Sequence, residues 1–380
     1  MALVEEKLAP VHVRGKISEL ILFISTSKGA FLYYSDPDRR HWDVNGPHFL
    51  GSKVYHLILD HRDNKTLIAS TQSFNNESII YISKNLGRSW ESANRIPDFI
   101  DNNYICYLSP GHISDPETWY AGTSNRGLLK SIDGGFNWET IHDSSSKSDI
   151  NKLITANKNN YHTKSKLQSI IIDPQDKNHL YVGLSPGGVF ESLDDGKNWR
   201  SLNKGLITQN ETNKINNPYS LVLHSSSPTY LFQQNSLGIF RLNKSSSEWL
   251  HIGDNLPKDI GSFGLPITIH PAEPNTIWVF PMDNNEAFSR VSQGGQPAVY
   301  CSQDAGDSWF RQDIGLPMRN AWFTVTEKCL STDCMDNTGV YFGTTSGSLW
   351  MSNNEGNSWR QIAVHLPEIT AIETGVILKK

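Results

Sequence analysis

The sequence lacks the features of three common protein classes. Its longest uninterrupted apolar run, residues 20–24, is far shorter than the roughly 20 residues of a membrane-spanning helix. Lys and Arg number 34 against 39 Asp and Glu, so the basic excess of a nucleic-acid-binding surface is missing. The four cysteines are too few for a disulfide framework in a chain of 380 residues. We therefore expect no membrane span and no nucleic-acid partner.

Two further absences bear on location and cofactors. Glu5 and Glu6 stand where a secretory signal would have a basic and then an apolar stretch, so a cytoplasmic location is predicted. Cys329 and Cys334 lie close together in sequence but lack the additional paired ligands of a zinc site. These two cysteines are predicted to lie reduced in a surface loop, and neither a metal nor an organic cofactor is expected.

The sequence is rich in tryptophan, with 11 residues, and seven of them mark a repeat. The repeat is an octapeptide, Ser-x-Asp-x-Gly-x-x-Trp. It occurs at 131–138, 192–199 and 302–309, with Asn in third place at 83–90 and 352–359, and in degenerate form at 35–42 and 242–249. The seven tryptophans are Trp42, Trp90, Trp138, Trp199, Trp249, Trp309 and Trp359, spaced 48, 48, 61, 50, 60 and 50 residues apart. This period fits one four-stranded propeller blade with its loops.

The octapeptide has a physical explanation as a turn between two strands. The third residue can accept hydrogen bonds from backbone N–H groups of its own turn. Glycine in fifth place permits a positive φ, and tryptophan in eighth place supplies a large apolar wedge. A structural role is therefore predicted for the third residues, Asn85, Asp133, Asp194, Asp304 and Asn354.

The pattern predicts an all-β, seven-bladed propeller formed by one domain over residues 1–380. Each blade has four strands, A to D from the innermost outward, and the octapeptide turn joins C to D. The first blade has only three strand-like segments at its start, ILFIST, AFLYYS and HWDVNG. Residues 368–378 supply the missing inner strand, so the C-terminal strand is predicted to close the ring onto the N-terminal blade.

The octapeptide is similar to the Asp-box, or BNR repeat, of sialidase-like propellers, and the resemblance covers nearly the whole chain. More narrowly, segments such as STSKGAFLYYSDPDRRHW, FGLPITIHP and TGVYFGTTSGSLWMSNNEGNSW resemble a group of single-propeller prokaryotic proteins of unassigned function. Asp-box propellers include sialidases, xyloglucan-cleaving glycosidases and non-enzymatic binding domains. The resemblance implies a propeller with the octapeptide turns opposite any active site, but it does not imply one function.

The sequence offers no complete catalytic set of either enzyme type. A sialidase site needs three converging arginines, and Arg95 in an Arg-Ile-Pro motif follows an octapeptide instead of preceding it, so a triad is not assembled. A xyloglucanase-like site needs two carboxylates facing a cleft, which those relatives generally form between two propellers. Carboxylates outside the octapeptides that could serve are Asp115, Glu117, Asp143, Asp283 and Glu286.

A ligand is expected on the face formed by the D–A and B–C connections, where inner strands begin at the central channel. The predicted ligand-binding residues are Tyr55, His56, Tyr107, Gln168, Tyr219 and Trp322 near inner-strand starts, and Gln233 near the end of a B strand. Aromatic faces with amides suit a neutral polar ligand, such as a sugar, or a peptide. One alternative is that these side chains plug the channel, with His56 a hydrogen-bonded core residue. Another is a metal site at the channel mouth around His56.

Two functions follow from these features. The first is a soluble, non-catalytic scaffold that binds a partner protein or a small neutral polar ligand, including carbohydrate, at the channel. The alternative is a sialidase-like glycoside hydrolase or lyase with an atypical site at the channel mouth. A channel filled by packed side chains would count against the enzyme, and a carboxylate-dependent turnover of a glycoside would count against the scaffold.

Overall fold

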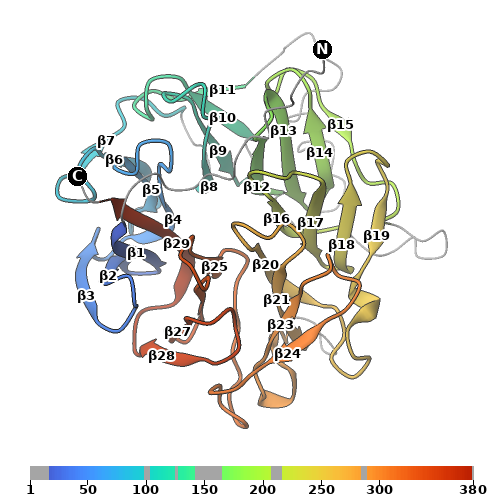
Figure 1. Ribbon diagram of the computed structural model, residues 1–380. Helices are drawn as coiled ribbons and strands as arrows, with labels where there is room; N and C mark the ends of the chain where they lie inside the picture. Colours follow the sequence, from blue (N-terminus) through green and yellow to red (C-terminus); the bar gives the residue numbers. More distant parts are fainter. Residues whose placement is uncertain are drawn as a thin grey trace, which may run out of the picture.

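The chain folds into a ring of seven antiparallel sheets around a central axis (Figure 1). The computed structural model describes residues 17–97, 103–124, 127–141, 165–206, 216–283 and 289–378. Within these ranges the helical segments are two short 3-10 turns, η2 (Gly253–Asn255) and η3 (Gln293–Gly295). The predicted fold class, an all-β seven-bladed propeller with four-stranded blades, is confirmed.

The blades follow one another around the ring in chain order, and neighbouring inner strands are in contact. From the inner to the outer strand, blade 1 contains β29 (Ile369–Leu378), β1 (Ile17–Thr26), β2 (Gly29–Ser35) and β3 (Trp42–His48), and blade 2 contains β4 (Lys53–Leu59), β5 (Leu67–Gln72), β6 (Ser78–Ser83) and β7 (Glu91–Ser92). Blade 3 contains β8 (Ile105–Pro110), β9 (Trp119–Thr123), β10 (Leu128–Ser131) and β11 (Glu139–Thr140). Blade 4 contains β12 (Lys166–Asp173), β13 (Asp176–Ser185), β14 (Gly188–Ser192) and β15 (Arg200–Ser201).

Blades 5 to 7 continue in the same way and complete the ring. Blade 5 contains β16 (Pro218–Leu223), β17 (Tyr230–Asn235), β18 (Gly238–Asn243) and β19 (Trp249–His251). Blade 6 contains β20 (Gly264–Ile269), β21 (Ile277–Asp283), β23 (Val299–Ser302) and β24 (Phe310–Gln312). Blade 7 contains β25 (Leu330–Thr332), β26 (Val340–Gly343), β27 (Leu349–Ser352) and β28 (Arg360–Ala363). A short additional strand, β22 (Val291–Ser292), pairs with β21. We call the side of the A–B and C–D turns the turn face, and the side of the B–C and D–A connections the loop face.

The ring closes through the C-terminal strand. β29 pairs antiparallel with β1, from Ile17 opposite Leu378 to Thr26 opposite Ile369. β29 is therefore the inner strand of blade 1, as the sequence predicts. This pairing leaves the first and last blades without an open sheet edge between them.

Six inner strands carry an irregularity close to their starts, including β29, where the register shifts between its pairs with Ser25 and Thr26. The pairing register shifts between Val54 and His56 in β4, and at the corresponding places in β8, β12, β16 and β20. A β-bulge adds a residue to one strand and alters the alternation of its side chains. Strict alternation therefore does not give the direction of Tyr55 and His56.

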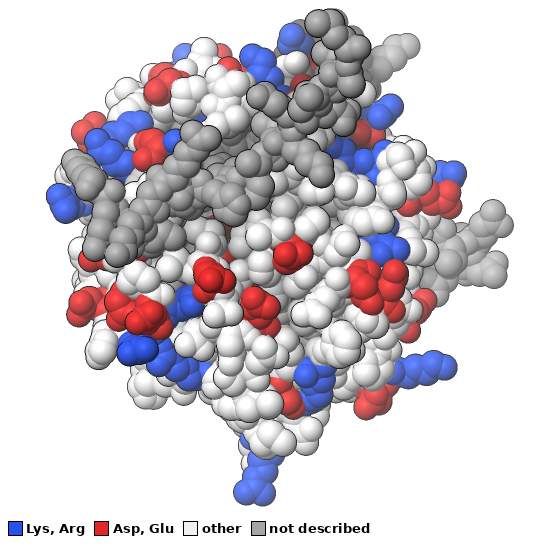
Figure 2. Space-filling view, in the orientation of Figure 1, with Lys and Arg blue, Asp and Glu red and all other residues white. Residues whose placement is uncertain are grey.

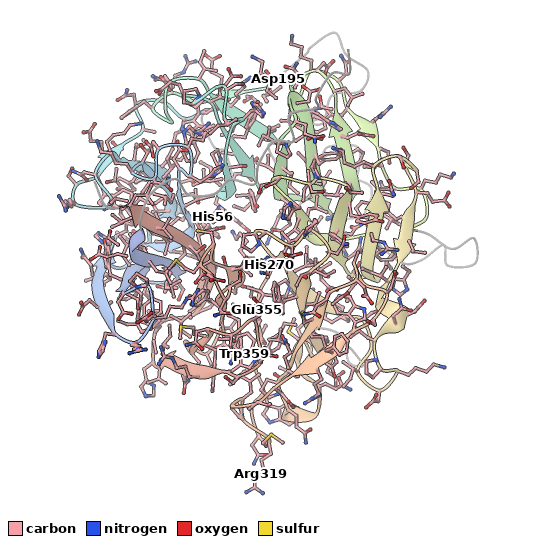
Figure 3. The ribbon with its side chains drawn as sticks, viewed as in Figure 1. His56, Asp195, His270, Arg319, Glu355 and Trp359 are labelled. Carbon is pink, nitrogen blue, oxygen red and sulfur yellow. The ribbon has the colours of Figure 1, made fainter. Side chains whose placement is uncertain are left out.

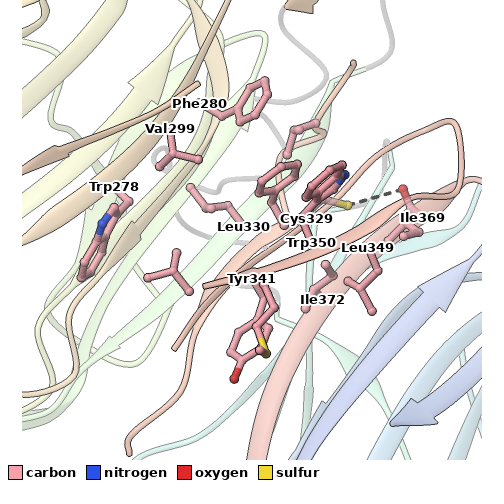
Figure 4. Packing of buried hydrophobic residues seen from close by; sticks show 14 of the residues in the cluster. Trp278, Phe280, Val299, Cys329, Leu330, Tyr341, Leu349, Trp350, Ile369 and Ile372 are labelled. Carbon is pink, nitrogen blue, oxygen red and sulfur yellow. Dashed lines mark hydrogen bonds between the residues drawn. The ribbon is translucent and has the colours of Figure 1, made fainter. Parts of the chain in front are cut away.

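The core lies between the blades and consists of large apolar side chains (Figure 4). Phe342 and Trp350 stack at 6.1 Å between ring centroids, with the planes 12° apart. Cys329 is buried beside them, and its thiol donates to the carbonyl oxygen of Ile369 at 3.4 Å. The predicted surface loop is therefore wrong for Cys329, because apolar packing against β29 covers it; Cys334 is exposed and reduced.

The octapeptide turns repeat one set of hydrogen bonds. In blade 6 the hydroxyl of Ser302 donates to Asp304 Oδ1 at 2.8 Å and accepts the N–H of Gly306 at 2.7 Å. Asp304 Oδ1 also accepts the N–H of Ser308 at 2.8 Å, and Gly306 has φ of 96°. The corresponding Ser and Asp or Asn side chains make these bonds in the turns that contain Asn85, Asp133, Asp194 and Asn354.

Candidate functional site

The loop face carries a pocket of about 330 Å³ between blades 5 and 6. One wall is the β17–β18 hairpin, and the others are the connection into β20, the end of β21 and η3. The residues that line it are Ser236, Leu237, Gly238, Lys258, Asp259, Ile260, Gly261, Ser262, Phe263, Met282, Asp283 and Gln293. Its volume is at the small end of the range for sites that hold small organic ligands.

The pocket combines two carboxylates with an aromatic ring and polar side chains. Asp259 lies in the D–A connection, and Asp283 ends β21. The amide of Gln293 donates to the carbonyl oxygen of Asp259 at 3.3 Å, and Gln234 donates to that of Ser262 at 3.0 Å. These bonds fix the backbone of the connection from two sides. Acid–base chemistry on a sugar requires two carboxylates that flank the scissile bond, and an aromatic surface helps to hold the sugar ring.

Trp322 lies beside this pocket, in the connection between β24 and β25 and not at the start of an inner strand. Its side chain is 60% exposed. The indole lies against Gly295, where an added Cβ would be 3.1 Å from the ring. Ala321 donates its N–H to the carbonyl oxygen of Gly295 at 3.0 Å, and Phe323 donates its N–H to Ser292 Oγ at 3.2 Å. An exposed indole is therefore fixed on both sides to the segment that supplies Gln293.

Tyr219 and Gln233 are placed differently from each other. Tyr219 is buried edge-on against Phe263 of the pocket at 6.3 Å, and the guanidinium of Arg290 lies 5.6 Å from its ring. Gln233 is fully buried on β17, and its Oε1 accepts from Asn235 Nδ2 at 3.0 Å. Tyr219 thus supports the pocket wall, whereas Gln233 packs behind the wall.

The other predicted residues lie at the central channel, on blades 2 to 4. His56 is fully buried near the centre of the ring (Figure 3). Its Nδ1 accepts the N–H of Leu108 at 3.0 Å, so the ring proton is on Nε2, which donates to Glu373 Oε1 at 2.9 Å. Burial lowers the pKa of His56. His56 is therefore a neutral imidazole that links blade 2 to blade 3 and to the closing strand.

Tyr107 and Lys328 lie close to His56 and its neighbours. The ring of Tyr107 lies 5.0 Å from that of His56, and burial raises the pKa of its hydroxyl. Lys328, which precedes β25, donates to the carbonyl oxygen of Tyr55 at 2.7 Å and to that of Cys106 at 2.5 Å. Its ammonium therefore reaches from blade 7 to blades 2 and 3. Gln168 is half-buried at the irregular start of β12.

The remaining sequence candidates do not converge on one site. Asp115 and Glu117 lie in the A–B connection of blade 3, on the turn face, and Asp143 and Glu286 lie outside the described residues. Arg95 is exposed and 4.0 Å from Glu139, and Arg319 projects outward from the ring (Figure 3). Of the five predicted acids, the described pocket therefore contains Asp283. Asp259 is not among the candidates predicted from the sequence, because a carboxylate in a connection carries no local pattern.

The described residues give no sign of a metal centre or of a helix that could cross a membrane. They contain no group of three or more His, Cys, Asp or Glu side chains arranged to hold a metal ion. Their two short 3-10 turns are far from the length and hydrophobicity of a spanning helix. Acidic and basic side chains are interspersed over the visible part of the face in Figure 2, without a broad basic patch.

The chain is similar to glycoside hydrolases. No family model matches it, so membership of the Asp-box sialidase-like family is not confirmed. It is 25% identical over 224 residues to a probable oligoxyloglucan-reducing end-specific xyloglucanase of Neosartorya fischeri, a match that covers 51% of this chain and 25% of the relative. The chain thus matches about a quarter of that relative's length.

Solved structures of related enzymes share the fold. The GH74 xyloglucanase of Xanthomonas campestris superposes with a TM-score of 0.65 at 16% identity, covering 91% of this chain and 54% of that one. The GH74 enzyme of Niastella koreensis gives 0.56 at 14% identity, covering 94% and 67%. At these identities the likeness establishes the propeller fold alone.

These matches correct the first functional prediction. A non-catalytic scaffold was the principal expectation, because the sequence offered no complete catalytic set. The sequence match to a named glycoside hydrolase contradicts that expectation and favours the hydrolase alternative. The sequence did not reveal the pocket because Asp259 lies in a D–A connection and Asp283 ends β21, and no local motif links the two residues.

Proposed function

We propose that this chain is a carbohydrate-active propeller with glycoside hydrolase activity, and that it acts on a β-glucan of the xyloglucan type. The observation that carries the proposal is the 25% identity over 224 residues to a xyloglucanase. The pocket between blades 5 and 6 supports it, because its lining includes two carboxylates beside Phe263. The octapeptide turns support the further proposal that the chain is an Asp-box propeller. Its cytoplasmic location is also a prediction.

The chemistry assigns the two carboxylates complementary roles. One protonated carboxyl donates to the oxygen of the leaving sugar, and the other, ionised, activates water or attacks the sugar directly. Phe263 gives the sugar ring an apolar surface, and Gln293 and Lys258 can hydrogen-bond its hydroxyl groups. Trp322, held beside the pocket, offers a second aromatic surface for the sugar that follows along the chain.

The test is turnover of defined oligosaccharides by the full chain. Xyloglucan oligosaccharides are incubated with the wild type and with Asp283→Asn and Asp259→Asn, and the products are separated by chromatography. Because acid–base catalysis contributes about 10²- to 10⁴-fold, at least one variant is expected to lose activity by about that factor. Asp43→Asn is the matched control, because Asp43 is exposed on the outer strand β3.

Two outcomes would contradict the proposal. One is the absence of product from xyloglucan and from unbranched β-glucans with a protein that remains folded. The other is a wild-type rate retained by both Asp283→Asn and Asp259→Asn, which would remove the pocket from the reaction.

A further inference from the structure

A row of tyrosines and lysines crosses the mouth of the central channel on the loop face, outside the pocket. The rings of Tyr55 on β4 and Tyr104, just before β8, are stacked 4.1 Å apart with planes 9° from parallel. Lys53 Nζ lies 5.1 Å from the ring of Tyr55, and Lys166 Nζ lies 5.7 Å from the ring of Tyr104. The facing sides of the two rings are in contact, and each ammonium lies close to its own ring. The order is Lys53, Tyr55, Tyr104, Lys166, which we call the lysine–tyrosine row.

The surrounding structure fixes the row in place. The hydroxyl of Tyr55 donates to Gln72 Oε1 at 2.8 Å, and the N–H of Tyr104 donates to Ser124 Oγ at 2.9 Å. Lys328 binds the carbonyl oxygens of Tyr55 and Cys106, so a third ammonium lies next to the row. Elements of blades 2, 3, 4 and 7 therefore meet at this point.

Within the part of the chain that the structure describes, no carboxylate is in direct contact with the lysines of the row or with Lys328. Among the described residues, none of Lys53, Lys166 and Lys328 has a carboxylate oxygen within 4.0 Å. The acidic side chains that influence this region from farther away are Glu327, Glu368 and Glu373. At such separations in water, attraction between two unit charges is about 1 kcal/mol or less, and salt screens it. The charges of Lys53 and Lys166 can therefore pair with carboxylates of a ligand, whereas Lys328 already donates to two carbonyl oxygens.

We propose that the lysine–tyrosine row binds an acidic oligosaccharide, with carboxylates of its uronic acid residues on Lys53 and Lys166. Lys53 begins the inner strand of blade 2 and Lys166 begins that of blade 4, with blade 3 between them, so a chain with repeated carboxylates suits the two lysines better than a single carboxylate does. The half-buried tyrosine rings supply apolar surface between the two charged ends. That the ligand is a carbohydrate rests on the proposed function; that it carries repeated negative charge rests on the row itself.

The test compares acidic with neutral oligosaccharides by isothermal titration calorimetry on the full chain. An oligogalacturonate of six residues is titrated against a xyloglucan oligosaccharide, each at low and high salt. The acidic ligand is expected to bind more tightly, and to weaken as salt rises. Lys53→Met and Lys166→Met are each expected to weaken acidic binding about tenfold, the effect of losing one charge-assisted contact. Lys65→Met, at an exposed lysine in the A–B turn of blade 2, is the matched control.

Three results would overturn the proposal. These are equal affinity for acidic and neutral ligands, unchanged acidic binding in both row variants, and equally effective binding of inorganic phosphate, which would reduce the row to a general anion contact. Its failure is distinguishable from that of the proposed function. If the protein hydrolysed xyloglucan but did not bind the oligogalacturonate, only the proposal for the lysine–tyrosine row would be wrong. If it bound the oligogalacturonate but hydrolysed no glycan, only the proposed enzyme function would be wrong.

Discussion

The turn face and the loop face of this propeller are built in different ways. On the turn face, Asp304 and its counterparts bond within a few residues of themselves, and the same bonds recur around the ring. On the loop face, the contacts that shape the candidate sites join distant segments, such as Lys328 with Tyr55, 273 positions apart. Repetition on one face supplies a stable ring, and the other face is free to differ from blade to blade.

Buried charges reinforce the turn face where the ring closes. Arg39 of blade 1 bonds to both carboxylate oxygens of Asp333 of blade 7, each at 2.8 Å, and both side chains are almost fully buried. The hydroxyl of Tyr341 donates to Asp333 Oδ2 at 2.6 Å, and the N–H of Gly339 donates to Oδ1 at 2.9 Å. The Asp333 carboxylate therefore links the first blade to the last, in addition to the β1–β29 pairing.

The strongest test of the contrast is to break that ion pair. Asp333→Asn removes the negative charge opposite Arg39, so the buried guanidinium loses its counter-ion. The new amide N–H groups would also face the N–H and O–H donors that now bond to the carboxylate. Breaking a buried pair costs about 3–5 kcal/mol, and we expect the free energy of unfolding, measured in urea, to fall by that amount. Asp38→Asn should cost less than about 1 kcal/mol, because Asp38 and Arg40 are exposed and 3.8 Å apart. Equal losses in the two variants would show that ring closure does not depend on the buried pair.

A second test uses pH, at a histidine held between two carboxylates on β12 to β14. His179 Nε2 lies 3.0 Å from Glu191 Oε2, and Nδ1 lies 3.4 Å from Asp173 Oδ2. Burial would lower the pKa of His179, but these two hydrogen bonds outweigh it and raise the pKa to about 8. A pKa raised on folding stabilises the protein fully below the unfolded value of about 6.5. That stabilisation is lost as pH rises through about 8.

The expected result is a loss of about 1–2 kcal/mol in the free energy of unfolding between about pH 6 and pH 9. Urea unfolding of the wild type and of His179→Gln at both pH values measures it, because only the wild type should show this part of the loss. His41→Gln is the control, since His41 is almost fully exposed beside Asp36. The same pH dependence in His179→Gln and wild type would assign the loss to other groups.

The two faces also differ in how far the sequence predicts them. The octapeptides and the tryptophan spacing predict the ring, its four-stranded blades and the closing strand, because each depends on local residues or on one long repeat. The pocket includes Asp259 and Asp283, which line the same cavity only once blade 6 is folded. The bulges at inner-strand starts altered the register that strict alternation predicts for Tyr55 and His56. Tertiary packing decided these positions, and no local pattern encodes it.

The mildest substitution tests the loop face alone. Trp322→Ala should change the free energy of unfolding by less than about 1 kcal/mol, because the indole is 60% exposed and lies against Gly295 at the surface. If the indole is a sugar surface beside the pocket, the KM for xyloglucan oligosaccharides should rise about tenfold, since one stacked ring contributes on the order of 1 kcal/mol. Trp322→Phe keeps an aromatic face and should recover part of the lost affinity, whereas a purely structural role would leave KM unchanged in both variants. Phe310→Ala is the control, because Phe310 is a similarly exposed aromatic residue on the outer strand β24. If Trp322→Ala and Phe310→Ala changed KM equally, the effect would not be specific to the pocket. Trp322 would then not be part of the substrate site.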